Sequence, residues 1–204
     1  MFGWWGLLSW AIQIAWIPFW AAGVVNGLAH WWGYRNYECP DKSTNLWPLA
    51  IWIGGEELHN NHHGFAASAK FSQRPWEIDI GWGVIVVLKR LGLAKVKHQA
   101  PKIKLQEKEA FDHETLNAVI AYRYAVLKRY SKKVMTEHFS LTREQQATIE
   151  QMKHRLELIW TTTRKNAEEL LLDLQQWCLD AKNSGIKALA DFANYVTKMH
   201  LHLA

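Results

Sequence analysis

The first 34 residues contain no aspartate, glutamate, lysine or arginine, and Arg35 is the first charged residue in a chain of 204. The stretch from Phe2 to Ala29 is long enough to cross a bilayer, which requires about 20 mainly apolar residues. Tryptophans occur near both ends, as in interfacial aromatic belts, at Trp4, Trp5, Trp31 and Trp32. The sequence therefore predicts a membrane span over residues 1–33, kinked at Pro18.

Two further absences exclude classes of secreted protein. No basic segment precedes the apolar run and no small-residue cleavage pattern closes it, so the run does not fit a signal peptide. A buried helix of a soluble protein is left as the alternative. Cys39 and Cys178 are the only cysteines, and their separation gives neither a disulfide framework nor a zinc knuckle. A reducing, cytoplasmic setting is therefore expected for the polar part.

Acidic residues are scarce between Lys70 and Lys104, where eight basic residues stand against two acids, a net charge of +6. Basic residues that follow a span favour the cytoplasmic side, where anionic head groups attract them. We therefore expect an integral membrane protein with the bulk of the chain on the cytoplasmic side. The patch comes with no nucleic-acid-binding motif, so we expect no nucleic acid partner.

Three histidines occur within five residues, in the segment His59-Asn60-Asn61-His62-His63. If residues 56–64 are helical, positions i, i+3 and i+4 share one face and the three imidazoles can converge on a metal ion. Imidazole suits iron, zinc, copper and nickel alike, so the spacing selects no particular metal. The alternative is three solvated histidines on a polar loop, but the flanking residues are apolar.

A second polar pair occurs at the inner end of the expected span. Asn26 and His30 are four residues apart and share a helix face. Polar and ionisable groups in membrane helices commonly mark function. An interfacial histidine that caps the helix end is the alternative.

Two apolar segments follow the span. The run from Leu46 to Ile53 is too short to cross a membrane, and we expect a buried or interfacial helix that delivers the histidine cluster. Ile78 to Leu93 is dense in apolar residues and carries Lys89 and Arg90 near its end. It predicts either an interfacial helix with its cations among the head groups or a core helix packed on the metal-binding segment.

Residues 105–204 show helical periodicity throughout. Asp112 is expected to cap a first helix, and a capping box at Thr142 to open a long helix that continues through Trp177. Gly185 should end it before a last helix over residues 186–196. The predicted fold is all-α: an integral membrane helix (1–33), a cytosolic helical metal-binding segment (34–104) and a C-terminal helical hairpin or small bundle (105–204).

Several motifs together resemble a known family. They are Asn26-x-x-x-His30, Gly33-Tyr34-Arg35-Asn36-Tyr37, Gly54-Gly55-Glu56-Glu57-Leu58 followed by the histidine cluster, Trp76-Glu77-Ile78-Asp79-Ile80-Gly81-Trp82, and Leu91-Gly92-Leu93-Ala94. In this order they are similar to the C-terminal part of membrane fatty acid desaturases of the delta-9 type, bacterial branch. The resemblance covers roughly residues 10–104, whereas residues 105–204 are less distinctive.

The resemblance implies an oxygen-dependent di-iron enzyme that introduces a double bond into a fatty acyl chain, carried as an acyl-CoA or an acyl-lipid. It implies O2 and an electron donor such as ferredoxin or a cytochrome b5-type protein as partners. Carried over by motif, His59, His62 and His63 form the third histidine box of iron ligands. His30 is an additional ligand, and Asn26 contributes through water.

The chain departs from the family pattern, because the first two histidine boxes would lie before Met1. Four histidines and one asparagine cannot complete the coordination of two irons, so we expect a C-terminal fragment of a desaturase that is inactive alone. One alternative is another membrane di-iron enzyme, a hydroxylase or sterol-type oxidase. The other is a non-enzymatic, membrane-anchored helical remnant.

Overall fold

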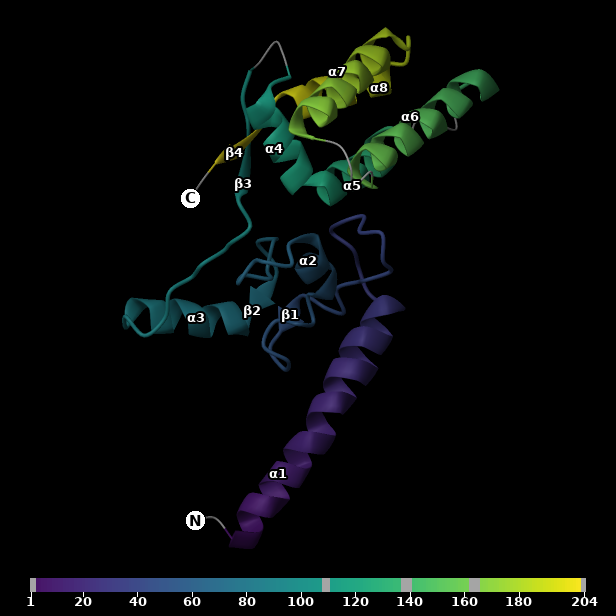
Figure 1. The fold of residues 1–204 in the computed structure, drawn as a ribbon. Helices are drawn as coiled ribbons and strands as arrows, with labels where there is room; N and C mark the ends of the chain where they lie inside the picture. Colours follow the sequence, from purple (N-terminus) through teal and green to yellow (C-terminus); the bar gives the residue numbers. More distant parts are fainter. Residues whose placement is uncertain (1–2, 108–110, 137–140, 162–165, 203–204) are drawn as a thin grey trace. The chain divides into compact units, whose positions relative to one another are not determined.

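The computed structural model describes residues 3–107, 111–136, 141–161 and 166–202. The chain forms two compact units, Met1–Ala100 and Pro101–Ala204. Helices are the main regular structure of both units, and each also holds one small sheet of two strands (Figure 1). The predicted all-α class is confirmed, since the strands are only two to four residues long.

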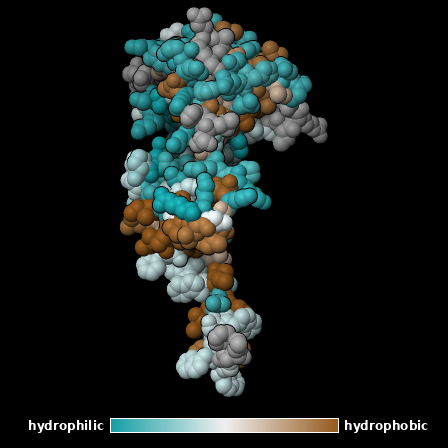
Figure 2. All heavy atoms as spheres, turned by 90° about the vertical axis from the view of Figure 1, so that its left-hand side faces the viewer, coloured by the Kyte–Doolittle hydropathy of each residue, from teal (hydrophilic) through white to brown (hydrophobic). Residues whose placement is uncertain are grey.

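The first unit begins with the apolar segment Gly3–His30, whose 28 residues are long and apolar enough to cross a membrane. Its side chains are almost all exposed and appear in Figure 2 as mostly brown and near-white spheres. The segment consists of α1 (Gly3–Pro18), a π-helical stretch (Phe19–Gly27) and a 3₁₀ turn (Leu28–His30). The helix thus changes its winding at Pro18, where the ring prevents a regular α-helical hydrogen bond.

The expected helix over Leu46–Ile53 is wrong. This run contains strand β1 (Leu49–Ala50), which pairs in parallel with β2 (Ile78–Asp79). Pro48 explains the difference, because a proline disfavours the helical conformation of the residue before it. Its carbonyl instead accepts a hydrogen bond from Ile78 N at 2.8 Å. The histidine cluster is consequently delivered by extended and turn segments.

Two helices complete the first unit. The histidine cluster lies on α2 (His59–Gly64), which begins three residues later than residue 56. α3 (Ile80–Arg90) starts at the cap of Asp79, whose Oδ1 accepts a hydrogen bond from Trp82 N at 2.8 Å. Position 81, two residues after this cap, requires glycine, because an added Cβ would clash with the Gly54 carbonyl oxygen. No residue of α3 is buried.

The second unit is a bundle of helices closed by a small sheet. β3 (Lys102–Leu105) pairs antiparallel with β4 (Met199–His202), so both ends of the unit meet. Between them lie α4 (His113–Ala121), α5 (Arg123–Lys133), α6 (Arg143–Thr161), α7 (Ala167–Asn183) and α8 (Lys187–Thr197). The predicted helical bundle in this half of the chain is confirmed.

The helix signals in this half are largely correct. Asp112 Oδ1 accepts from Thr115 N at 2.8 Å, and Thr142 and Gln145 form the reciprocal hydrogen bonds of a capping box. Gly185 ends α7 with φ of 71°, in the left-handed conformation that glycine adopts without strain.

The single long helix expected through Trp177 is instead two helices, α6 and α7. Asn166 caps the second helix by accepting a hydrogen bond from Glu169 N at 2.9 Å. Trp177 Nε1 donates to the Met152 carbonyl oxygen at 2.9 Å, although these residues would be about 37 Å apart in one continuous helix. Burial of Trp177 against Tyr130 and Phe192 therefore favours the break.

Candidate metal centre

His30 lies at the C-terminal end of the apolar segment, in a turn that the following loop holds in place. Thr44 contacts the carbonyl oxygen of buried Ala29 twice, through its backbone N at 2.6 Å and its Oγ1 at 2.9 Å. Thr44 Oγ1 also donates to the Trp32 carbonyl oxygen at 2.6 Å. These hydrogen bonds fix the position of His30 relative to the loop of residues 31–45.

The two asparagines between the histidines anchor α2 from its opposite face. Asn60 Oδ1 accepts from the backbone N of Asn36 and Tyr37 at 2.7 and 2.8 Å, and its Nδ2 donates to the Ser43 carbonyl oxygen at 3.1 Å. Asn61 Oδ1 accepts from the side-chain amides of Asn36 and Asn45. Both asparagines are buried, so a helix of six residues gains a fixed orientation from side-chain hydrogen bonds.

Glu77 is the buried centre of this hydrogen-bonding frame. Its Oε1 accepts from Tyr34 Oη at 2.8 Å and from Asn36 Nδ2 at 2.6 Å. Its Oε2 accepts from Asn61 Nδ2 at 2.8 Å and from two backbone N–H groups, those of Gln73 and Arg74. A carboxylate with this many donors is stable in a buried position. We call the set Tyr34, Asn36, Asn45, Asn60, Asn61 and Glu77 the asparagine frame.

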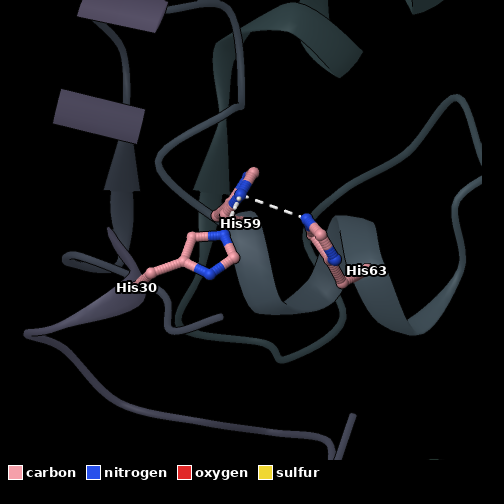
Figure 3. A group of neighbouring side chains, drawn as sticks. All are labelled: His30, His59 and His63. Carbon is pink, nitrogen blue, oxygen red and sulfur yellow. Dashed lines mark hydrogen bonds between the residues drawn. The ribbon is translucent and has the colours of Figure 1, made fainter. Parts of the chain in front are cut away.

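His30, His59 and His63 converge on one point (Figure 3). His59 Nε2 lies 3.1 Å from His30 Nε2 and also 3.1 Å from His63 Nε2. One nitrogen atom from each ring lies within 4.8 Å of the other two. His59 is buried, while the other two side chains are partly exposed.

This arrangement fits a metal ion. An ion about 2.1 Å from each imidazole nitrogen would separate the nitrogens by about 3.0–3.4 Å at octahedral or tetrahedral angles, close to the two 3.1 Å distances around His59. Neutral imidazoles are suitable ligands for the first-row transition metals. A ligand set of three histidines also leaves coordination positions for other ligands.

His62 does not join this group. Its ring packs against Phe71, with 4.8 Å between the ring centroids, and its buried Nδ1 has no hydrogen-bond partner among the described residues. Burial lowers the pKa of His62 against the opposing effect of the Glu56 carboxylate, and the neighbouring His63 and His59 lower it further. The His62 ring also lies beside the group, with its centroid 6.1 Å from that of His59 and 5.7 Å from that of His63.

Two carboxylates lie beside the histidines. Asp41 Oδ2 is 2.7 Å from His63 Nδ1, and Glu56 Oε2 is 3.9 Å from His59 Nδ1. Partial burial opposes ionisation of Asp41, but hydrogen bonds from Ser43 and His63 hold its pKa below the usual range. The nearby His59 ring lowers the pKa of Glu56 against the opposing effect of burial. Both carboxylates place negative charge next to the three histidines, which favours binding of a cation.

Asn26 makes a hydrogen bond within its own helix. It is exposed, and its Nδ2 donates to the carbonyl oxygen of Ala21, five residues earlier, at 2.8 Å. This i−5 contact follows the π-helical winding of Phe19–Gly27. Of the five residues predicted for the site, the structure thus joins the ring nitrogens of three. His62 packs on Phe71 beside them, and Asn26 makes its hydrogen bond within its own helix.

The sequence patterns did not identify Asp41, Asn45 or Glu77 as parts of the site. The one available signal was the position of Asn60 and Asn61 within the histidine cluster. On a helix whose one face carries His59 and His63, these two asparagines must point to the opposite side. The asparagines that bond to Asn61 lie 16 and 25 residues before it in the sequence. Contacts at that separation leave no periodic trace in a sequence.

Comparison with known proteins gives relatives of one kind. The chain is 39% identical over 94 residues to an sn-1 stearoyl-lipid 9-desaturase from Anabaena variabilis, covering 45% of this chain and 34% of the relative. It is 39% identical over 113 residues to an acyl-CoA 5-desaturase from Anemone leveillei, covering 53% and 35%. It is 42% identical over 71 residues to Delta-9 acyl-lipid desaturase 1 from Arabidopsis thaliana, covering 35% and 23%.

These matches are partial. The chain spans about a third of the length of the Anabaena and Anemone relatives. No protein-family model and no solved structure matches it. The relatives nevertheless agree with one another in being desaturases of lipid-linked or CoA-linked acyl chains.

Proposed function

We propose that this chain, which is related to the membrane fatty acid desaturases, supplies part of the metal centre of an acyl desaturase. The observation that carries the proposal is the convergence of His30, His59 and His63, with two nitrogen distances of 3.1 Å, at the end of an apolar segment long enough to span a membrane. The desaturase relatives give that cluster its chemical context.

The geometry supports different roles for the four histidines. His30, His59 and His63 would hold one iron ion through the ring nitrogens that face one another. His62, whose buried Nδ1 has no partner among the described residues, would contribute to a second ion. Asn26 would contribute through water, after its amide leaves the Ala21 carbonyl oxygen. Bound iron would supply the oxygen-derived oxidant that an unactivated C–H bond requires, which zinc cannot because it has no redox chemistry.

The remaining partners follow from the reaction class. The substrate would be a fatty acyl chain, linked to CoA or to a lipid, since relatives of both descriptions match. O2 and an electron donor such as ferredoxin or a cytochrome b5-type protein would complete the reaction. The protein's own contribution near the ions would be to hold the imidazoles of α2 in place through the asparagine frame.

We propose that the polar parts of the chain lie on the cytoplasmic side. The apolar segment and the desaturase relatives support association with a membrane. The excess of basic residues between Lys70 and Lys104 supports the orientation, because positive residues near spans are retained in the cytoplasm.

A chimera would test the function. The part of the Anabaena desaturase that matches this chain would be replaced by the matching residues of this chain and expressed in a host without its own desaturase. We expect new unsaturated acyl chains in the host lipids, detected by gas chromatography. A chimera with His62→Ala should give none, and one with His98→Ala, an exposed position within the matching segment, should keep the activity.

The chimera separates the alternatives. A membrane-inserted, iron-containing chimera that adds a hydroxyl group to the acyl chain would point to a hydroxylase. One that inserts but binds no iron and forms no product would leave a non-enzymatic remnant as the description of this chain. Either result would overturn the proposed function.

We further propose that α3 lies in the membrane interface. Its exposed apolar side chains are followed by two cations, Lys89 and Arg90, which suit the head-group layer. The core-helix alternative has no support in the described residues, because none of α3 is buried. The apolar side chains exposed on α3 and beside it are Trp76, Ile78, Ile80, Val84, Val87, Leu91 and Leu93.

A fluorescent probe on α3 should therefore report a lipid environment. We expect a nitrobenzoxadiazole label on Val84→Cys in vesicle-reconstituted chain to emit at shorter wavelength and to be quenched by lipids that carry a shallow nitroxide. The native Cys39 and Cys178 are free but buried, and the parent chain measures any labelling there. The matched control is Glu144→Cys, exposed on α6 of the other unit. Equal quenching at both positions would contradict the interfacial placement.

A further inference from the structure

Asp41 contacts the outer nitrogen of His63. Its Oδ2 lies 2.7 Å from His63 Nδ1, while the opposite ring nitrogen, Nε2, lies 3.1 Å from His59 Nε2. The His63 imidazole is thus held between a carboxylate on one side and the convergent nitrogens on the other. Neither periodicity nor motif spacing in the sequence singles out Asp41, which occurs in a polar turn.

The Asp41 carboxylate is itself fixed to the asparagine frame. Its Oδ1 accepts a hydrogen bond from Ser43 N at 2.8 Å. Ser43 is buried and its carbonyl oxygen accepts from Asn60 Nδ2 at 3.1 Å. Because Asn60 lies on α2, three residues before His63, the carboxylate and the imidazole are held by the same short chain of contacts.

We propose that Asp41 is a positioning residue that keeps His63 in the tautomer with hydrogen on Nδ1. A carboxylate can only accept hydrogen bonds, so the nitrogen 2.7 Å away must carry a hydrogen. In a neutral imidazole the other nitrogen then has a free lone pair, which here is Nε2 and faces the point where a metal ion fits. The carboxylate also makes that nitrogen a more basic ligand.

This arrangement distinguishes His63 from the other histidines of α2. His59 Nδ1 and His62 Nδ1 are buried and have no hydrogen-bond partner among the described residues. Glu56 is 3.9 Å from His59 Nδ1, beyond hydrogen-bond distance. The effect of removing Asp41 should therefore appear at His63 and leave the tautomers of His59 and His62 unchanged.

The tautomer can be measured without any metal. We would label the histidines of the full chain with ¹⁵N, keep it metal-free in detergent at about pH 8, where imidazole is neutral, and record ring-nitrogen shifts by NMR. His63→Ala identifies the signals. We expect hydrogen on Nδ1 of His63 in the parent chain. In Asp41→Asn, Oδ1 can still accept from Ser43 N, and the amide nitrogen then donates toward His63, so the hydrogen should move to Nε2.

Metal affinity gives a second readout. With Co²⁺ as the probe, we expect Asp41→Asn to weaken binding about 10- to 100-fold, the usual effect of losing the partner of a histidine ligand. In the His63→Ala background the same substitution should cause no further loss, whereas a general structural defect would weaken binding in both backgrounds. The control Asp191→Asn changes an exposed carboxylate on α8 and should leave both readouts unchanged.

The inference gives Asp41 a role within the proposed metal centre, so it rests on the proposed function, but the two can fail separately. A parent chain with hydrogen on Nε2 of His63, or an unchanged tautomer in Asp41→Asn, overturns the positioning role. Equal Co²⁺ affinity in Asp41→Asn and the parent overturns it as well. Absence of metal binding in every variant would count against the proposed function, and the tautomer measurement would still decide the role of Asp41.

Discussion

His59→Ala is expected to remove metal binding from this chain, because His59 holds the central position among the three convergent histidines. Its Nε2 makes both of the 3.1 Å contacts in the group, so the substitution removes the nitrogen that joins His30 to His63. The loss should exceed the roughly 10- to 100-fold that follows when only the partner of a ligand is removed. Titration of the full chain in detergent with Co²⁺, followed by absorption, measures the affinity.

Two further variants make the result specific to the site. His62→Ala should keep the ion held by the other three histidines, since its ring faces Phe71. His154→Ala, exposed on α6, should bind Co²⁺ like the parent chain. Comparable losses from His59→Ala and His154→Ala would reject the three-histidine site.

Glu77→Ala should cause the largest loss of stability in the first unit. The substitution leaves buried donors of Asn36 and Asn61 and the backbone N–H groups of Gln73 and Arg74 without their acceptor. Each buried polar group that loses its partner costs about 1–3 kcal/mol, so we expect a loss of more than about 3 kcal/mol. Thermal unfolding of the full chain, followed by near-ultraviolet circular dichroism, gives the change.

The same variant should also weaken metal binding, since Asn61 lies on α2 between the histidines. Glu77→Gln keeps the shape and one acceptor oxygen, and we expect an intermediate loss. Glu144→Ala, at an exposed position in the first turn of α6, serves as the control. Unfolding of Glu77→Ala at the same temperature as the parent chain would show that the frame is not needed for stability.

The local parts of the fold were accessible from the sequence. The uncharged segment before Arg35, the cap at Asp112 and the stop at Gly185 each depend on a few neighbouring residues, and the structure agrees with them. The run Leu46–Ile53 has the composition of a helix but contains a strand, because Pro48 disfavours the helical conformation of the residue before it.

The site was only partly accessible. Helical spacing treats His59, His62 and His63 as equivalent, but only His59 and His63 bring a ring nitrogen to His30, while His62 packs against Phe71. Asp41 and Glu77 act through partners 22 and 41 residues away, respectively at His63 and Asn36. Such pairings arise from the path of the chain between the elements, which no local pattern encodes.

The asparagine frame also bears on the order of folding. Its hydrogen bonds all join residues between Tyr34 and Glu77, and the longest separation is 43 residues. The entropic cost of closing a loop grows slowly with its length, and domains commonly fold as units from the N-terminal side during synthesis. The histidine helix can therefore reach its final orientation while the second unit is still being translated, so a defect in that later bundle would leave the metal ligands correctly assembled.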